Sequence, residues 1–210
     1  MTKISTNVAG ILLTFLFAGL ISSCKKETLR SEHGYKIASA SEANKKRVIR
    51  DYSDDFVTYY QFIPDLANGW VPPNPGPAWY PGGGEGNASH LGKVSTYYNQ
   101  YASFSPTGFG STAAPVNMFF ASQLSAIGID VPDAVSTIVF DKKGNSVWFR
   151  LISNTTVPVS QTRINFSGVS DIIGGTGKFA GATGQVKIIG YFNPTDPNDA
   201  AVSSVGFITY

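Results

Sequence analysis

Alternation of apolar and polar residues runs through the second half of the chain and predicts β-strands. Within Ser146–Ser153 every second residue is apolar and faces one way (Val147, Phe149 and Leu151), as in a half-buried strand. The segment Asp141–Asn145 contains a glycine and predicts the turn of a hairpin. The predicted strands are Asp55–Ile63, Lys93–Phe104, Thr137–Phe140, Ser146–Ser153, Thr162–Val169, Gln185–Phe192 and Ala201–Tyr210.

Two segments do not follow this pattern. Leu66–Gly86 holds five prolines and many glycines together with Trp70, Trp79 and Tyr80, which predicts a long loop. Loops of this length are often functional. Pro115–Ile129 spaces its apolar residues partly as a helix does, and we expect a helix or an irregular crossover there.

The N-terminus has the pattern of an export signal. The apolar run Val8–Ile21 is too short to span a bilayer comfortably, but it suits the core of a signal peptide. Leu20–Cys24 then looks like a lipobox, in which an aliphatic residue and small residues precede a cysteine. We therefore expect a bacterial lipoprotein precursor, cut before Cys24 and lipidated on that thiol. The alternative is an ordinary secretory signal with an incidental cysteine.

Composition narrows the fold class. Cys24 is the only cysteine, so no disulfide or thiolate metal cluster is expected. Only 14% of residues are charged, whereas glycine, tyrosine and phenylalanine are plentiful, which favours an all-β domain with tight turns. The expected organisation is a signal peptide (1–23), a lipidated tether (24–50) and one β-domain (51–210).

Charge is unevenly distributed along the chain. Lys25–Arg50 carries eight basic and three acidic residues, whereas the chain from Asp51 onward carries seven basic and eleven acidic ones. The basic segment is poor in large apolar residues and predicts a disordered tether, either lying against anionic lipid headgroups or acting as a solvated spacer. An exported domain with net negative charge does not predict nucleic-acid binding. Lys25, rather than Asp, follows Cys24, which by resemblance to lipoprotein sorting favours the outer membrane.

The glycine-rich segment Gly174–Gly184 (GGTGKFAGATG) is not a phosphate-binding loop. A P-loop would need Gly at position 172 and a hydroxyl residue after Lys178, and the segment leads into a strand rather than a helix. It instead resembles the "GGTGRFAGATG" turn of allene oxide cyclase-like and dirigent-like barrels. Asn87–Lys93 is similar to the "THLG-basic" opening of a strand in bacterial members, and the Asp141–Phe149 hairpin resembles their mid-domain hairpin. The structural residues of the turn are Gly174, Gly175, Gly177, Phe179, Gly181 and Gly184.

This resemblance implies an antiparallel eight-stranded β-barrel of calycin-like form, with the aromatic ring of the turn packed into one end. Such a barrel is either filled by side chains or holds one small ligand. Plant relatives act on lipophilic substrates: one branch cyclises an unsaturated epoxide, and the other steers phenoxy-radical coupling. None of their catalytic residues can be placed on this chain, and no cofactor is expected.

Several polar and aromatic residues are candidates for binding a ligand. Arg150 and Arg163 lie either on the outer surface or in the cavity, where they could orient a carboxylate. In the second case their expected companions are Tyr97, Asn165 and Tyr191. Trp70, Trp79 and Tyr80 either stack on a ligand or form a lid over the barrel mouth. His90 is the one histidine after the tether, so it predicts a structural role rather than a metal site.

Three functions remain open from the sequence. The leading hypothesis is a membrane-tethered barrel that binds a small hydrophobic or amphipathic molecule. The second is a cyclase- or isomerase-type enzyme acting on a lipophilic substrate in the cavity. The third is a structural or interaction lipoprotein with a solid core. The sequence leaves the ligand, the membrane face and the oligomeric state open.

Overall fold

The structure is a computed structural model and describes residues 47–105 and 108–210. The predicted signal peptide, Cys24 and nearly all of the predicted tether lie outside the described residues. Among the described residues, no helix is long and apolar enough to cross a membrane.

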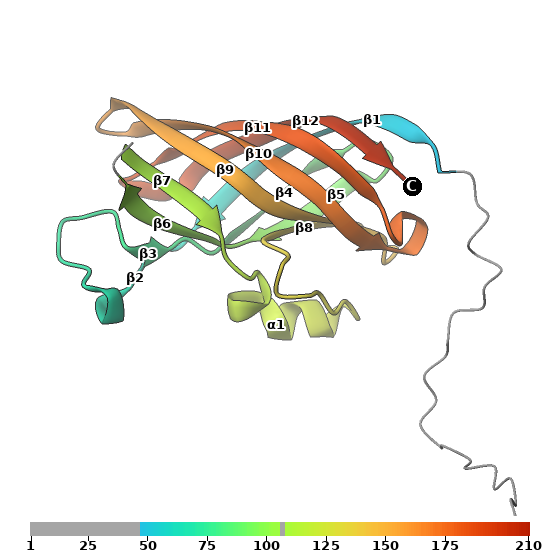
Figure 1. Cartoon of the computed structure of the whole chain (residues 1–210), viewed down its shortest axis with the longest axis horizontal. Helices are drawn as coiled ribbons and strands as arrows, with labels where there is room; N and C mark the ends of the chain where they lie inside the picture. Colours follow the sequence, from blue (N-terminus) through green and yellow to red (C-terminus); the bar gives the residue numbers. More distant parts are fainter. Residues whose placement is uncertain (1–46, 106–107) are drawn as a thin grey trace, which may run out of the picture. The chain divides into compact units, whose positions relative to one another are not determined.

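Strands make up most of the described chain, which confirms the all-β class (Figure 1). The strands are β1 (Ile49–Tyr60), β2 (Ile63–Pro64), β3 (Ala78–Trp79), β4 (Gly82–Ala88), β5 (Gly92–Tyr98), β6 (Gln100–Ser105), β7 (Gly108–Ala113), β8 (Thr137–Phe140), β9 (Ser146–Ser160), β10 (Arg163–Thr176), β11 (Thr183–Asn193) and β12 (Asp196–Thr209). One α-helix, α1 (Asn117–Ala126), and two short 3₁₀ segments, η2 (Leu66–Asn68) and η3 (Gly177–Phe179), accompany them.

Eight strands close into an antiparallel barrel, as predicted. Their order is β10-β11-β12-β1-β4-β5-β8-β9, and pairing between β9 and β10 closes the ring. Closure leaves these strands without free edges. The short strands β7, β6, β3 and β2 extend the sheet from the second half of β9.

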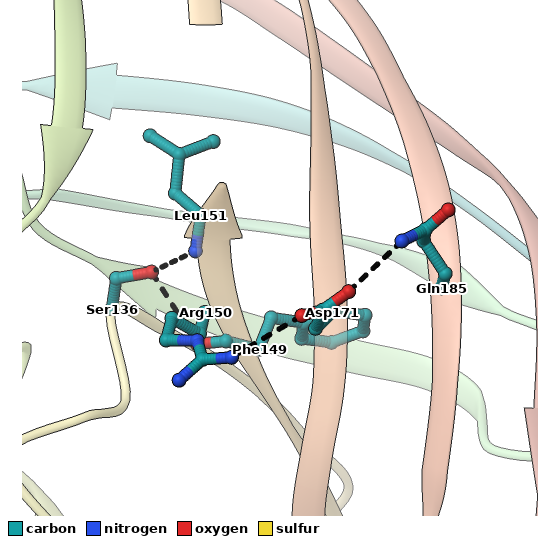
Figure 2. Close-up of polar contacts among 6 residues, drawn as sticks. All are labelled: Ser136, Phe149, Arg150, Leu151, Asp171 and Gln185. Carbon is teal, nitrogen blue, oxygen red and sulfur yellow. Dashed lines mark hydrogen bonds and ion pairs between the residues drawn. The ribbon is translucent and has the colours of Figure 1, made fainter. Parts of the chain in front are cut away.

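Strand β9 changes partner part-way along its length. Its first residues pair with β8, and Thr155 pairs with Gly110 of β7. At the change, the Ser136 hydroxyl accepts a hydrogen bond from the Leu151 amide at 2.9 Å and donates one to the Phe149 carbonyl at 3.3 Å (Figure 2). Ser136, which directly precedes β8, therefore continues the hydrogen-bond ladder of β9 beyond the first residue of β8.

Helix α1 joins β7 to β8 and confirms the helical alternative for the Pro115–Ile129 segment. Its buried residues Phe120 and Leu124 belong to an apolar cluster with Val135 and Ile138. The outward-facing ring of Tyr97 stacks on Phe120 with centroids 4.5 Å apart. The helix thus covers part of the outer wall and leaves the interior to the strands.

One end of the barrel is solid. This closed end lies where β1 begins and β12 finishes (Figure 1, right). Its core contains Tyr52, Phe149, Ile172 and Ile208, and the fully buried Phe179 of η3 closes it. The packed aromatic of the glycine-rich turn, implied by the resemblance, is therefore present.

The structure corrects several predicted boundaries. Strand β1 begins at Ile49, inside the predicted tether and six residues before the predicted start at Asp55. Gly82–Gly86 belongs to β4 and not to the predicted loop. A Cβ atom on Gly82 would lie 2.4 Å from the Tyr98 ring, so the missing side chain gives that ring its space. Glycines carry no apolar or polar signal, and the alternation rule therefore misses this strand.

The glycine-rich motif is also part strand and part turn. Gly174 and Gly175 lie in β10 and Gly184 in β11. Only Gly177 (φ 60°) and Gly181 (φ 70°) of this motif have the left-handed backbone that a turn can require. The motif therefore ends one strand, places Phe179 inside the barrel and starts the next strand.

Candidate functional site

The half of the barrel away from Phe179 is hollow. It contains a cavity of about 130 Å³. The aromatic and aliphatic lining includes Phe56, Tyr60, Tyr80, Tyr98, Phe109, Phe149, Leu151, Phe166, Val186, Ile188, Phe192 and Val202. The polar lining includes Asp54, Thr58, Thr96, Gln100, Ser111, Thr137, Asn154, Thr156, Ser170 and Ser204. The expectation of a wholly solid core is therefore met at one end only.

Asp54 brings a carboxyl group into this cavity. In β1 the buried positions alternate, so Asp54 points inward with Tyr52, Phe56 and Thr58. Its side chain is 7% exposed, and its Oδ2 accepts a hydrogen bond from the Tyr52 hydroxyl at 3.0 Å. Its Oδ1 has no hydrogen-bond partner among the described residues. An unpartnered buried oxygen is costly, and a ligand that donates a hydrogen bond would satisfy it.

Burial controls the acidity of both members of this pair. It raises the pKa of Asp54 to about 6, because the low-dielectric interior disfavours the carboxylate. The nearby hydroxyls of Ser204 and Tyr52 oppose this rise, although only Tyr52 is close and aligned enough to form a hydrogen bond with Asp54, and the charge of Asp55 adds to the rise. Burial, together with the neighbouring Asp54, raises the pKa of Tyr52 well above its usual value. Tyr52 therefore remains a hydrogen-bond donor at neutral pH.

A second polar group lies on strands of the opposite wall. Asn154 on β9 donates through Nδ2 to Ser111 Oγ at 2.9 Å and to Gln100 Oε1 at 3.3 Å. Its Oδ1 is buried and has no partner within the part of the chain that the structure describes. Strands β1 and β9 are four places apart in the ring of eight, so Asp54 and Asn154 belong to opposite walls. The cavity thus offers two acceptor oxygens without donors.

Aromatic rings line the way to the cavity. The Tyr60 ring lies 5.8 Å from Tyr80 and 5.6 Å from Phe192, and all three line the cavity. The half-exposed Phe62 ring lies 5.5 Å from Tyr80 and 5.7 Å from Trp70. These contacts connect the Pro/Gly-rich loop with the interior at the open end.

The two arginines proposed as ligand contacts lie on the outer surface. Arg150 leaves β9 on the side opposite Leu151 and forms an ion pair with Asp171 at 3.3 Å (Figure 2). The Gln185 side chain donates to the other oxygen of Asp171 at 3.0 Å. These contacts account for Arg150 as a solvent-exposed residue of the barrel wall.

Arg163 and its expected companions also face outward. The Arg163 guanidinium lies over the Tyr191 ring, 3.8 Å from its centroid, and donates to Asn165 Oδ1 at 3.0 Å. The Tyr191 hydroxyl donates to Asp199. Arg163, Tyr191 and Asn165 are thus together, but on the outside of β10 and β11.

Of the aromatic candidates, Tyr80 alone lines the cavity. Its hydroxyl donates to the Pro75 carbonyl at 2.7 Å, and burial raises its pKa. The Trp70 indole donates to the Asn74 carbonyl at 2.6 Å, and Trp79 packs on Tyr101 at 5.3 Å. Trp70 and Trp79 therefore brace the loop, and Tyr97 packs under α1.

The sequence hypotheses missed Asp54 and Asn154. The alternation in Tyr52–Tyr60 would have placed Asp54 on the inner face, had the strand been extended past Asp55 toward the N-terminus. Asn154 was hidden by the register shift in β9, which interrupts the alternation between Leu151 and Asn154. A carboxyl in a mainly apolar strand face was the available signal for this site.

The charged groups of the cavity lining are few. The lining contains no Lys, Arg or His, as judged from the residues that the structure describes. No three His, Cys, Asp or Glu side chains within 47–105 and 108–210 are grouped to hold a metal ion. Outside the cavity, His90 contacts the Asp51 carbonyl through Nε2 at 2.8 Å. Asp54 is thus the one ionisable carboxyl that the described cavity wall contains.

No protein-family profile matches the chain, and no curated protein matches its sequence. Among solved structures, the chain is similar to the pterocarpan synthase dirigent protein GePTS1. The two are 12% identical with a TM-score of 0.45, and the match covers 79% of this chain and 87% of that one. The barrel assignment rests on the strand pairing of this chain.

Proposed function

We propose that this protein is an envelope lipoprotein whose barrel binds one small hydrophobic or amphipathic molecule in its hollow half. The observation that carries the proposal is a mainly apolar cavity into which Asp54 directs an oxygen without a partner. Apolar walls with a few convergent polar groups are typical of ligand sites. The motif at Gly174–Gly184, with its resemblance to allene oxide cyclase-like and dirigent-like barrels, is consistent with such a role.

The size of the cavity limits the ligand. An engineered protein cavity of roughly 150 Å³ holds one benzene molecule. The cavity of about 130 Å³ therefore suits a single ring or a short alkyl chain. A longer ligand would have to extend past Tyr60 and Tyr80 toward the open end.

The polarity of the cavity selects among such ligands. The described lining offers acceptor oxygens on Asp54 and Asn154 and no cationic side chain. A ligand carboxylate would meet a carboxyl group without a compensating charge. We therefore favour an alcohol or an amine over an acid. An arginine inside the cavity would have suited a carboxylate ligand, but the arginines lie outside.

Four ligands of matched shape test this at pH 7.5 by calorimetric titration: benzyl alcohol, benzylamine, benzoate and toluene. We expect the alcohol and the amine to bind more tightly than toluene, and benzoate not to bind. Asp54→Asn should weaken benzylamine by about tenfold or more, because it removes a charge-assisted hydrogen bond. The exposed neighbour Asp55→Asn is the control. Binding of benzoate alone, or of none of the four, would refute the proposal.

An isomerase-type enzyme is the second candidate, and one observation favours it. A carboxyl group with a pKa of about 6 in an apolar cavity can accept or donate a proton near neutral pH. Exchange of the α-protons of cyclohexanone in deuterated water, followed by NMR, tests this capacity. Acceleration that rises between pH 5 and 7 and disappears in Asp54→Asn, but not in Asp55→Asn, would support catalysis. Equal exchange rates in Asp54→Asn and Asp55→Asn would exclude it.

The membrane anchor forms the other part of the proposal. The lipobox ending at Cys24 and the basic segment Lys25–Arg50 support lipidation and attachment to an envelope membrane. Lys25 favours the outer membrane. Mass analysis of the N-terminal peptide from a Gram-negative host should find a diacylglyceryl and acyl modification on Cys24, and Cys24→Ala should release the protein to the soluble fraction. An unmodified, membrane-free Cys24 would contradict the anchor.

A further inference from the structure

The closed end of the barrel carries most of the cationic side chains of the described residues. Residues 47–105 and 108–210 contain nine Lys and Arg residues, and six of these lie at this end. The six are Arg47, Arg50, Lys93, Lys142, Lys143 and Lys178, and all six are exposed. Each precedes β1, starts β1 or β5, or belongs to the β8–β9 turn or η3.

Contacts tie two of these segments, β1 and η3, to the β4–β5 turn and to Tyr210. The Arg50 guanidinium lies 5.2 Å from the centroid of the Tyr210 ring, and the His90 ring lies 6.0 Å from the same ring. Lys178 Nζ donates to the His90 carbonyl. The cations Arg50 of β1 and Lys178 of η3, together with His90 of the β4–β5 turn, therefore lie around Tyr210, which directly follows β12.

The β8–β9 turn joins the same surface. The Lys178 amide donates to Asn145 Oδ1 at 3.2 Å, which holds η3 against the turn that contains Lys142 and Lys143. Arg47 lies beside Gly181, just after η3. Arg47, Arg50, Lys142, Lys143 and Lys178 therefore lie on segments that contact one another at the closed end.

Acidic groups do not neutralise this surface. Against the six cations, this end of the described chain carries three carboxyl groups: Asp51, Asp141, and Asp55, which lies level with Lys93 across β4. The Asp141 carboxylate accepts hydrogen bonds from the Lys143 and Asn145 amides at 2.8 and 3.0 Å, and so belongs to its own turn. No ion pair joins any of the six cations to a carboxylate within the described residues. The open end, in contrast, carries Asp65, Asp196 and Asp199 and a single cation, Arg163.

We propose that the closed end docks on the anionic phospholipid headgroups of the leaflet that holds the lipid of Cys24, so that the cavity opens away from the membrane. This inference rests on the proposed anchor. The chain enters the barrel at the basic end, directly after Lys45 and Lys46. The roughly 25 residues between Cys24 and β1 can span up to roughly 80 Å, so they permit docking and equally permit the opposite orientation. Charge complementarity selects the basic end.

The lipidated full chain, reconstituted in vesicles, provides the test. Because lipid occupies Cys24, a cysteine introduced at Thr183 (closed end) or at Gln161 (open end) is the one free thiol for a fluorescent donor; both positions are exposed. Energy transfer to acceptor-labelled headgroups then reports which end is near the bilayer. We expect high transfer from position 183 and low transfer from position 161 in vesicles of phosphatidylglycerol and phosphatidylcholine. The difference should shrink in pure phosphatidylcholine and in high salt.

Two triple variants with equal loss of charge separate docking from net charge. The variant K142Q/K143Q/K178Q removes three cations of the closed end, and R150Q/R163Q/K187Q removes the three cations elsewhere on the described chain. A cation near an anionic surface contributes about fivefold to the docked population, so the first variant should lower the ratio of docked to free barrels by about a hundredfold. The second variant should leave this ratio nearly unchanged.

Higher transfer from position 161, or transfer that ignores lipid charge, would overturn the docking proposal. Equal effects of the two triple variants would overturn it as well. If mass analysis finds no lipid on Cys24, the anchor proposal fails separately. Flotation of the unlipidated chain with anionic vesicles then tests docking by itself. Docking is supported if the wild type floats and only the first triple variant fails to float, and it is refuted if the wild type does not float.

Discussion

At the scale of single residues, Asp54 combines two roles that oppose each other. Its carboxyl lies among apolar side chains, where burial raises its pKa to about 6 from the usual 3.8. The charged form therefore destabilises the fold, while the oxygen without a partner makes the cavity receptive to a donor. A bound alcohol or amine would donate a hydrogen bond to this oxygen.

This raised pKa makes a prediction about stability. The folded state binds the Asp54 proton more tightly than the unfolded state, so the contribution is present below pH 4 and is lost as pH rises through about 6. The size of the shift corresponds to at most about 3 kcal/mol of unfolding free energy. In urea unfolding, Asp54→Asn should therefore gain stability relative to wild type between pH 4.5 and pH 7.5. Asp55→Asn should show no such trend, and a parallel pH profile for all three proteins would disprove the assignment.

Sequence alone left open whether Arg150 and Arg163 face the cavity or the outer surface, and it did not single out Asp54 or Asn154. Arg150 and Tyr97 occupy positions in strands that the sequence predicted, but each strand has two faces and the outward face has its own partners, Asp171 and Phe120. Closure of the ring of strands determines which face of each strand points inward. Convergence of side chains from strands far apart in the sequence, such as Asp54 and Asn154, is set by pairing order.

At the scale of secondary-structure elements, most strands could be predicted because one face of each is apolar. The strands β3, β4 and β7 were not predicted, and the single strand predicted over Lys93–Phe104 is divided into β5 and β6. The ends of β1, β9 and β10 and the start of β12 also differ from the prediction. In β9 the periodicity breaks where the strand changes partner, and the β10 register shifts there as well. Local pattern therefore gives the existence of a strand more reliably than its limits.

Where β9 changes partner, the Ser136 hydroxyl accepts the hydrogen bond of a β9 amide. Ser136→Ala would leave the buried Leu151 amide without an acceptor, at a cost of about 1–3 kcal/mol of unfolding free energy. Hydrogen exchange should also accelerate at the Leu151 amide more than at other β9 amides. Ser153→Ala, at an exposed position of the same strand, is the comparison. Unchanged exchange at Leu151 would show that the hydroxyl is dispensable.

The short element η3 should stabilise the closed end through Phe179. Its ring is fully buried and lies 4.7 Å from the Tyr210 ring. Phe179→Ala should lower the unfolding free energy by about 3–5 kcal/mol, whereas Phe207→Ala, on the exposed outer wall, should cost much less. Chemical denaturation measures both. Similar losses for the two variants would show that the plug does not support the core.

At the scale of the whole molecule, the two ends of the described barrel differ in charge. Six of the nine described cations lie at the closed end, whereas Asp65, Asp196 and Asp199 lie with one cation, Arg163, at the open end. An acidic rim should attract cationic ligands and accelerate their entry at low ionic strength. In stopped-flow measurements, benzylamine should associate about twofold to threefold more slowly in high salt, while benzyl alcohol should be insensitive. Asp196→Asn should reduce the salt effect, and an equal effect on both ligands would contradict steering.

The division of the barrel into a solid half and a hollow half also bears on how such a protein can change over time. Side chains around Phe179 must fit one another closely, so few replacements are tolerated there. Side chains such as Thr58 and Ser170 line the cavity and can be exchanged at little cost to folding. A lineage could therefore vary the molecule it binds while its scaffold stays constant, and a saturation mutagenesis map should divide into an intolerant and a permissive half along the barrel axis.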